Sequence, residues 1–263
     1  MSTLLVSIVC IGAVGLVCGL ALALGARFLA VKEDPRIAQI QACLPGANCG
    51  GCGFAGCQAY AAAIVKGDAP FNRCTPGGVC AATGIAKVMG VSFDGEIEEF
   101  VAVVKCGGDD LSAVKKFAYN GITDCAAAAA VAGGDKGCPY GCLGYGSCVR
   151  ACPSHAIEIV RGIAKVHSEL CIGCGACAQV CPRRVIELIP RSSKVHVFCK
   201  SQDNGATVRK YCSKGCIGCR LCVKNAAEGV IIVDGTLARV NHSIPFDGDA
   251  ALEKCPTKCL RRD

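Results

Sequence analysis

Cysteine is the residue that most constrains what this chain can fold into. The 263 residues include 25 cysteines, a share typical of disulfide-rich proteins and of proteins that carry many metal ligands. The number is odd, so disulfides within one chain cannot pair every thiol. The chain has no tryptophan and only 5% aromatic residues, so large side chains contribute little to a core. Groups bound by the cysteines are expected to supply part of that core.

The first segment is predicted to cross a membrane. The apolar run from Leu4 to Val31 contains one charged residue, Arg27, and exceeds the roughly 20 residues that span a bilayer. A cleaved secretory signal is the alternative, but no basic residue precedes the run. Because Arg27 lies near the end of the run and Lys32 and Arg36 follow it, the positive-inside rule places the bulk of the chain in the cytoplasm. Thiols stay reduced there, which favours metal ligation over disulfides.

The strongest motif is Cys171-x2-Cys174-x2-Cys177-x3-Cys181-Pro182. It has the spacing of bacterial ferredoxins, in which three thiolates bind one [4Fe–4S] cluster and the fourth binds a second cluster. A related sequence, Cys138-x3-Cys142-x5-Cys148-x3-Cys152-Pro153, precedes it with a longer loop. Exchange of the fourth ligands predicts cluster 2 on Cys138, Cys142, Cys148 and Cys181, and cluster 3 on Cys152, Cys171, Cys174 and Cys177.

Zinc is the alternative metal for cysteines at close spacing. Structural zinc sites use two separated cysteine pairs, whereas these cysteines come in threes and are followed by Cys-Pro. The four histidines of the chain also lie outside the motifs. The pattern therefore favours iron–sulfur clusters.

A third triple, Cys216-x2-Cys219-x2-Cys222, is incomplete, because Ala226 stands where the fourth cysteine is expected. A later Cys255-Pro256 offers a remote ligand, while residues 246–252 replace the triple that would precede it. One cluster, cluster 4, is predicted on Cys216, Cys219, Cys222 and Cys255. The alternatives to Cys255 are Cys212, Cys199 and Cys259.

The first cysteine group is Cys49-x2-Cys52-x4-Cys57, with Cys74 following later. Four thiolates suffice for one [4Fe–4S] cluster, and a set of reactive or structural thiols is the alternative. Four further cysteines have no partner at a diagnostic spacing and are expected to be small buried hydrophobic residues. They are Cys43, Cys80, Cys106 and Cys125.

The combination of features resembles a known family over essentially the whole chain. These features are the N-terminal span, the segment Cys43-Leu-Pro-Gly-Ala-Asn-Cys49-Gly-Gly-Cys52-Gly-Phe-Ala-Gly-Cys57, the segment Asn72-Arg-Cys74-Thr-Pro-Gly-Gly78 and the tandem ferredoxin motifs. They resemble the B subunit of the Rnf electron-transport complex, in its longer form with an extra ferredoxin unit. The resemblance implies that Cys49, Cys52, Cys57 and Cys74 bind cluster 1, so that four [4Fe–4S] clusters are expected.

The resemblance also implies a function and a location. In this family the complex is a translocase that couples electron flow between reduced ferredoxin and NAD to the movement of Na⁺ or H⁺. The B subunit receives the ferredoxin electrons on the cytoplasmic side of the bacterial inner membrane, and its partners are the other subunits and soluble ferredoxin. The missing ligands at Ala226 and in residues 246–252 leave the number of clusters open.

The expected fold class is α+β, with a transmembrane helix followed by small iron–sulfur domains. The predicted division is an anchor at 1–31, a 4Fe-4S domain at 32–90, an α/β linker at 91–135, a two-cluster ferredoxin-like domain at 136–192 and a degenerate ferredoxin-like domain with one cluster at 193–263. Strands are expected at 156–160 and 185–189, and a helix at the alanine run 126–130.

Charge is unevenly distributed along the chain. Residues 136–263 contain 19 basic and 10 acidic side chains, while each oxidised cluster with four thiolates adds about −2. The remaining mild positive charge suits an acidic ferredoxin, and no nucleic-acid-binding motif accompanies it.

Other functions are weighed against this one. The alternatives are an iron–sulfur subunit of another ferredoxin-linked oxidoreductase and a cysteine-rich zinc-binding scaffold. The sequence contains no glycine-rich dinucleotide loop and no acid–base constellation. No catalytic residue is therefore predicted, and NAD and flavin chemistry is assigned to other proteins of the complex.

Overall fold

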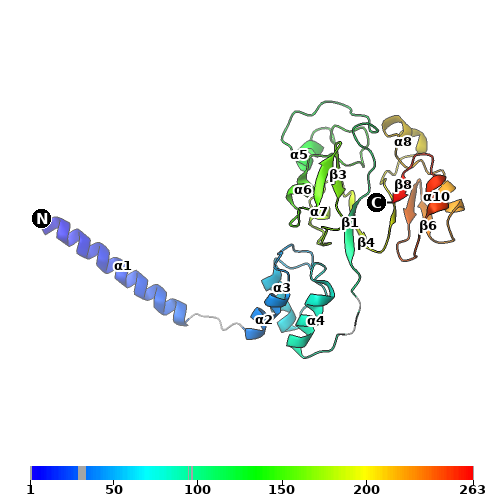
Figure 1. Cartoon of the computed structure of the whole chain (residues 1–263). Helices are drawn as coiled ribbons and strands as arrows, with labels where there is room; N and C mark the ends of the chain where they lie inside the picture. The colour runs from blue at the N-terminus through cyan, green and yellow to red at the C-terminus, as the bar shows by residue number, and fades with distance from the viewer. Residues whose placement is uncertain (1, 29–33, 94, 96, 263) are drawn as a thin grey trace.

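The computed structural model describes residues 2–28, 34–93, 95 and 97–262. Helix α1 (Ser2–Phe28) extends away from the remainder of the chain (Figure 1). Its segment Leu5–Gly25 is long and apolar enough to cross a membrane and is not buried against the rest of the protein. The predicted anchor boundary after residue 31 and the basic residue Lys32 lie outside the described residues.

Three helices form the next domain: α2 (Pro35–Cys43), α3 (Cys57–Lys66) and α4 (Gly78–Met89). Asp34 accepts a hydrogen bond from the Arg36 N–H and Pro35 opens α2, which are the residue types expected at a helix start. The core between the helices contains Ile40, Tyr60 and Ile85, each at most 1% exposed. The helices thereby hold the loops that carry the first cysteine group.

A unit of four strands follows. Strand β1 (Phe100–Val104) pairs antiparallel with β4 (Ile186–Pro190), and β2 (Ile157–Val160) pairs with β3 (Ile163–Val166). The one-turn helices α6 (Ser147–Arg150) and α7 (Ala176–Gln179) precede β2 and β4. Thus β1 lies within the segment expected to be a separate linker. It belongs with this unit because its valine-rich sequence is buried against β4.

The C-terminal part repeats this arrangement. Strand β5 (Val195–Val197) pairs with β8 (Leu260–Arg262), and β6 (Ile231–Asp234) pairs with β7 (Leu237–Val240). The short helices α9 (Leu221–Lys224) and α10 (Asp249–Glu253) take the places of α6 and α7. In both units the first strand pairs with the last, and the two middle strands form a hairpin. We call them the first and second strand units.

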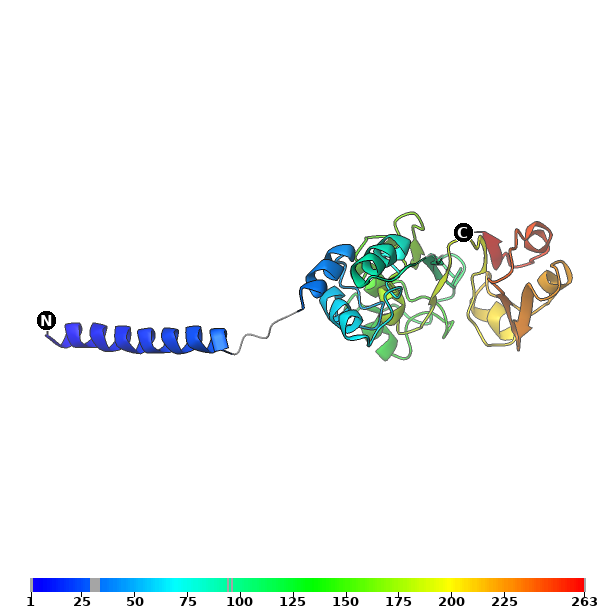
Figure 2. The same cartoon turned by 90° about the horizontal axis from the view of Figure 1, so that it is seen from below.

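Two segments join the strand units. The backbone N–H of Gly107 donates to the carbonyl of Phe198 over 2.9 Å, and Val114 N–H donates to the carbonyl of Tyr211 over 2.9 Å. Helix α5 (Cys125–Ala130) follows in the first of these segments, and helix α8 (Gly205–Tyr211) lies in the second. Figure 2 shows the resulting order along the molecule: α1, the three-helix domain, the first strand unit and the second strand unit.

Candidate metal centres

The four cysteines predicted for cluster 1 line one cavity in the three-helix domain. They are Cys49, Cys52, Cys57 and Cys74. Burial raises the pKa of Cys74, and the other three thiols raise it further. The Cys57 N–H donates to Asn48 Oδ1 over 2.8 Å, so the cysteine loop is fixed to the start of α3. A side chain at Gly77 would lie 3.1 Å from the Cys74 sulfur and 2.4 Å from Ala81, which explains glycine at this position.

The cysteines predicted for cluster 3 also lie together. The pKa of Cys177 is raised to about 12. Burial is the largest cause, and the neighbouring thiols add to it: Cys171, Cys174, Cys148 and Cys152. Two backbone groups donate to the sulfurs of this group: Ala102 N–H to Cys171 over 3.4 Å and Ala156 N–H to Cys152 over 3.3 Å. Such donors stabilise a negatively charged thiolate. The group is therefore suited to bind a cluster.

The loops before α6, α7 and α9 share one backbone conformation. Positive φ angles occur at Gly144 and Gly146, at Gly173 and Gly175, and at Gly218 and Arg220. A side chain at Gly144 would lie 2.2 Å from the carbonyl of Gly162, and one at Gly173 would lie 2.4 Å from the carbonyl of Phe100. The residue between each pair is Tyr145, Cys174 and Cys219, respectively. The loop before α6 therefore has tyrosine where the other two loops have cysteine.

Cys125 lies beside the loop that has this tyrosine. Burial raises the pKa of Cys148 to about 11, with Cys125 and Cys181 as the neighbouring thiols. Asp124 caps α5 by accepting from the N–H groups of Ala126 and Ala127.

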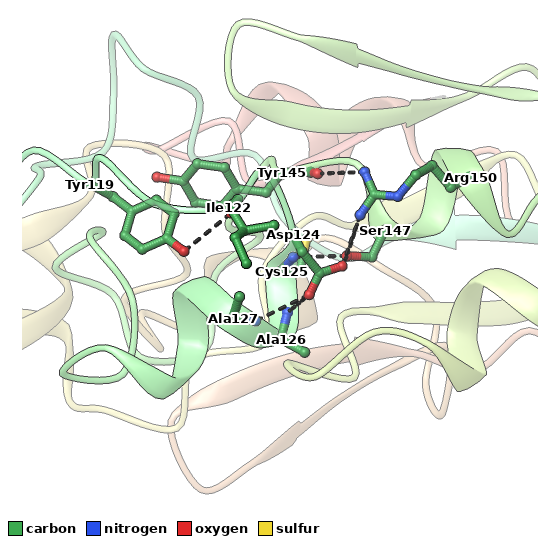
Figure 3. Close-up of polar contacts among 9 residues, drawn as sticks. All are labelled: Tyr119, Ile122, Asp124, Cys125, Ala126, Ala127, Tyr145, Ser147 and Arg150. Carbon is green, nitrogen blue, oxygen red and sulfur yellow. Dashed lines mark hydrogen bonds and ion pairs between the residues drawn. The ribbon is translucent and has the colours of Figure 1, made fainter.

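Side chains of α6 hold Cys125 in place (Figure 3). Ser147 Oγ accepts from the Cys125 N–H over 2.8 Å and donates to Asp124 over 2.7 Å, while Arg150 forms an ion pair with Asp124 at 2.8 Å. These contacts fix Cys125 next to the helix that carries Cys148.

The structure places Cys138 in a different group from the one predicted for cluster 2. Burial raises the pKa of Cys138 to about 12, and its neighbouring thiols are Cys106, Cys199 and Cys212. These four cysteines line one cavity between the strand units, and we call them the interdomain group. Cys138 was predicted to be the first ligand of its motif, but the loop conformation shared with α7 begins at Cys142.

The cysteines predicted for cluster 4 line a cavity in the second strand unit. They are Cys216, Cys219, Cys222 and Cys255. Burial raises the pKa of Cys222, as do the other three thiols. Ala251 occupies the position four residues before Cys255 and is fully buried, so this half of the unit has a methyl group in place of a second thiol.

Cys259 also lines the cluster 4 cavity and contacts two other thiols. Its hydrogen bonds lower the pKa of Cys216 to about 6 and that of Cys199 to about 7, while its own pKa is raised by both contacts. The Cys259 thiol therefore lies next to both sulfurs, and its single S–H can donate to one of them at a time. Cys212 lies in the interdomain cavity instead, so of the three alternatives to Cys255 only Cys259 shares the cluster 4 cavity.

The neighbourhoods of Cys106 and Cys125, which are both buried, were not predicted from the sequence. The repeat of the two strand units could have revealed the position of Cys106. It lies two residues after β1, as Cys199 lies two residues after β5. Cys80, expected to be buried, is exposed on α4, where it faces away from the helical core; Cys43 is half-buried.

The cavities fit a group larger than one ion. Among the described residues, no three His, Cys, Asp or Glu side chains form a site for a single metal ion. A [4Fe–4S] cluster has four irons that each take one thiolate, so its ligands surround a cavity rather than a point. The four predicted ligands of cluster 1, and likewise those of cluster 4, line such a cavity.

Comparisons with known proteins agree with the cysteine pattern. Residues 44–76 match the FeS family model for an Fe–S cluster, and residues 164–187 match a 4Fe-4S binding domain. The chain is 43% identical over 265 residues to the B subunit of the proton-translocating ferredoxin:NAD(+) oxidoreductase complex of Clostridium ljungdahlii, covering 99% of this chain and 93% of that protein.

Two further relatives cover nearly the whole chain. It is 39% identical to the B subunit of the Na(+)-translocating ferredoxin:NAD(+) oxidoreductase complex of Acetobacterium woodii, over 100% of this chain and 79% of that protein. It is 38% identical to the B subunit of the ion-translocating oxidoreductase complex of Methanosarcina acetivorans, over 98% of each protein. The resemblance predicted from the sequence is confirmed, and the chain belongs to the family of B subunits of Rnf-type ion-translocating oxidoreductase complexes.

Proposed function

We propose that this protein is the membrane-anchored electron-relay subunit of an Rnf-type complex, which passes electrons from reduced ferredoxin towards NAD⁺ and is coupled to Na⁺ or H⁺ translocation. The observation that carries the proposal is the contact between separate cysteine groups. Burial and the nearby Cys49 thiol raise the pKa of Cys174, and a side chain at Gly51 would lie 2.5 Å from the Cys174 carbonyl. The cluster 1 loop therefore packs directly on the cluster 3 loop.

The residues proposed to bind clusters 1, 3 and 4 are those predicted from the sequence. For cluster 2 we propose Cys142, Cys148 and Cys181 with Cys125 in place of Cys138, because Cys125 supplies the thiol that Tyr145 lacks. Bound [4Fe–4S] clusters supply one-electron transfer. Two one-electron transfers and one proton convert NAD⁺ to NADH at a site in another protein of the complex.

The second strand unit offers the docking surface for ferredoxin. Cys219 is exposed, and exposed basic side chains lie next to the cluster 4 ligands in sequence. They are Arg220, Lys224, Lys254 and Lys258. Arg220 also lines the cavity itself. A positive rim attracts an acidic partner and speeds its association, which suits a donor that leaves after each transfer.

The anchor sets the orientation of the relay. We propose that α1 spans the bacterial inner membrane and leaves the domains in the cytoplasm, because basic residues follow the span. The three-helix domain then lies next to the membrane, while the second strand unit lies at the opposite end of the molecule (Figure 2). Other subunits of the complex are expected to receive electrons near the membrane.

The test is anaerobic purification of the full chain in detergent, followed by iron and sulfide analysis and by reduction with ferredoxin. Brown protein with roughly four irons and four sulfides per cluster, whose visible absorption bleaches when reduced ferredoxin is added, supports the relay. A colourless, zinc-loaded preparation would overturn it in favour of the scaffold function. Iron-loaded protein that ferredoxin fails to reduce would overturn the proposed donor.

A further inference from the structure

We infer that the interdomain group, Cys106, Cys138, Cys199 and Cys212, binds a fifth [4Fe–4S] cluster between the two strand units. No family model matches any of these four residues, since the two matches cover 44–76 and 164–187. The four cysteines come from four separate places in the chain, which is why no sequence spacing reveals them.

The cavity has the lining of the proposed cluster sites. Four cysteines line it, as the four predicted ligands line the cavities of cluster 1 and cluster 4. Glycines leave room beside the sulfurs: a side chain at Gly108 would lie 3.2 Å from the Cys212 sulfur, and one at Gly141 would lie 3.6 Å from the Cys138 sulfur.

Charge around the cavity favours an anionic occupant. The described lining includes Lys105, Lys136 and Lys200 and no carboxylate. Lys105 and Lys136 are 8% and 2% exposed, and buried ammonium groups are costly unless a negative charge balances them. Glu187 lies 4.0 Å from Lys105 and 3.2 Å from Lys200, whereas Lys136 Nζ donates only to backbone carbonyls in the contacts described. An oxidised cluster with four thiolates carries about −2.

Backbone contacts fix the ligands from both units. The Gly107 N–H donates to the Phe198 carbonyl, so the segments that carry Cys106 and Cys199 lie side by side. Ala113 and Cys212 form an isolated antiparallel bridge. Lys136 Nζ donates to the carbonyls of Gly108 and Gly162 over 3.1 and 2.7 Å, which positions the segment that leads to Cys138. The shape of the cavity is therefore fixed by backbone and lysine contacts that lie outside the predicted cysteine motifs.

The position of this group completes the relay. The Cys142 N–H donates to the Cys106 sulfur over 3.4 Å, which links the interdomain group to cluster 2. On its other side, Cys199 packs against the core cluster that contains Cys216 and Cys259, and both of these cysteines line the cluster 4 cavity. The cysteine groups then form one series from the second strand unit to the three-helix domain. This role rests on the proposed function, whereas the binding of a cluster does not.

The experiment counts iron and sulfide in the anaerobically purified full chain and its variants. The wild type is expected to hold about twenty irons, since each cluster holds roughly four. Cys138→Ala and Cys212→Ala are each expected to lose about four, and the double variant no more than either single one. Cys138→Ala combined with Cys148→Ala is expected to lose about eight, because the two residues serve different clusters. Cys80→Ala is the matched control and keeps all iron.

Two results would overturn the inference. A wild-type count of about sixteen irons needs no variant to fold and leaves no iron for a fifth cluster. Full iron content in Cys212→Ala, or a loss of only about four in the Cys138 and Cys148 double variant, would show that the cysteines group as the motif spacing predicts. Protein without any iron would instead defeat the proposed function.

Discussion

The backbone N–H of Cys142 donates a hydrogen bond to the sulfur of Cys106 across 3.4 Å, although 36 residues separate the two. Cys142 opens the ligand loop before α6, and Cys106 follows strand β1. Two cysteine groups therefore share one backbone contact. The N–H stabilises a thiolate at Cys106, while burial and then the Cys106 sulfur raise the pKa of the Cys142 thiol to about 12.

Cluster 1 can be tested by removal of one ligand. Cys52→Ala is expected to lose about four irons per chain, because the buried site offers no replacement for the missing thiolate. Iron analysis and the EPR spectrum of the reduced protein measure the loss. Cys80→Ala, a change at an exposed cysteine of the same domain, is expected to leave iron unchanged. An equal loss from Cys80→Ala would show that Cys80 contributes to a cluster.

Deletion of residues 1–31 is expected to give a soluble protein that keeps its iron. Every proposed ligand lies at or beyond Cys49, and α1 is not buried against the domains. Size-exclusion chromatography without detergent, together with iron analysis, provides the measurement. Complete loss of iron from the truncated chain would contradict a separation of anchor and redox domains.

Cysteines that lie close together in the sequence could be grouped from it, whereas cysteines that only the fold brings together could not. Cys171, Cys174 and Cys177 are close in sequence, and their loop geometry follows from local spacing, so the sequence alone groups them. Cys106 and Cys212 could not, because their proximity depends on how β1 pairs with β4 and how two loops meet between the strand units. The sequence also does not reveal the place of strand β1, since its partner lies more than 80 residues away.

The capping residue Asp124 is expected to control cluster 2. Asp124→Ala removes the contacts with Ser147 and Arg150 that fix Cys125 (Figure 3), so about four irons should become labile to chelator. Asp124→Asn retains an oxygen that can accept from the α5 N–H groups, and it should restore most of the iron. Asp234→Ala, which alters an exposed ion pair with Arg239, is the control. Equal chelator sensitivity in the Asp124→Ala and Asp234→Ala proteins would argue against the positioning role of Asp124.

His196 is expected to make the second strand unit acid-sensitive. Burial, together with the smaller effects of Lys105 and His242, lowers the pKa of His196 to about 4. The folded-state pKa is below the usual 6.5, so the neutral form is favoured by folding. The stabilisation is present above pH 6.5 and is lost as the pH falls towards 4, by up to about 3 kcal/mol.

Anaerobic thermal unfolding at pH 7.5 and 5.5 measures this effect. The melting temperature of the wild type is expected to be lower at pH 5.5 than at pH 7.5. The decrease is expected to be smaller in the His196→Leu protein, because leucine takes up no proton. The exposed His155 provides the control, since His155→Leu should keep the wild-type pH dependence. The same decrease in the His196→Leu protein would assign the acid sensitivity to other groups.

Reversal of charge beside cluster 4 is expected to slow reduction by ferredoxin. Lys254 and Lys258 are exposed and flank Cys255, so changing both to Glu alters the local charge by four units while leaving every proposed ligand in place. The association rate should fall several-fold at low salt, and the difference should shrink as salt rises, because screening limits the field to about 8 Å near physiological ionic strength. Iron content should not change.

The matched control reverses Lys66 and Lys87, two exposed residues of the three-helix domain. Stopped-flow reduction by ferredoxin at low and high salt compares the two double variants. Slower reduction only in the Lys254 and Lys258 variant places docking on the second strand unit, because the total charge change is the same in both proteins. Slower reduction only in the Lys66 and Lys87 variant would instead place docking near cluster 1, which would reverse the proposed order of electron transfer along the cysteine groups.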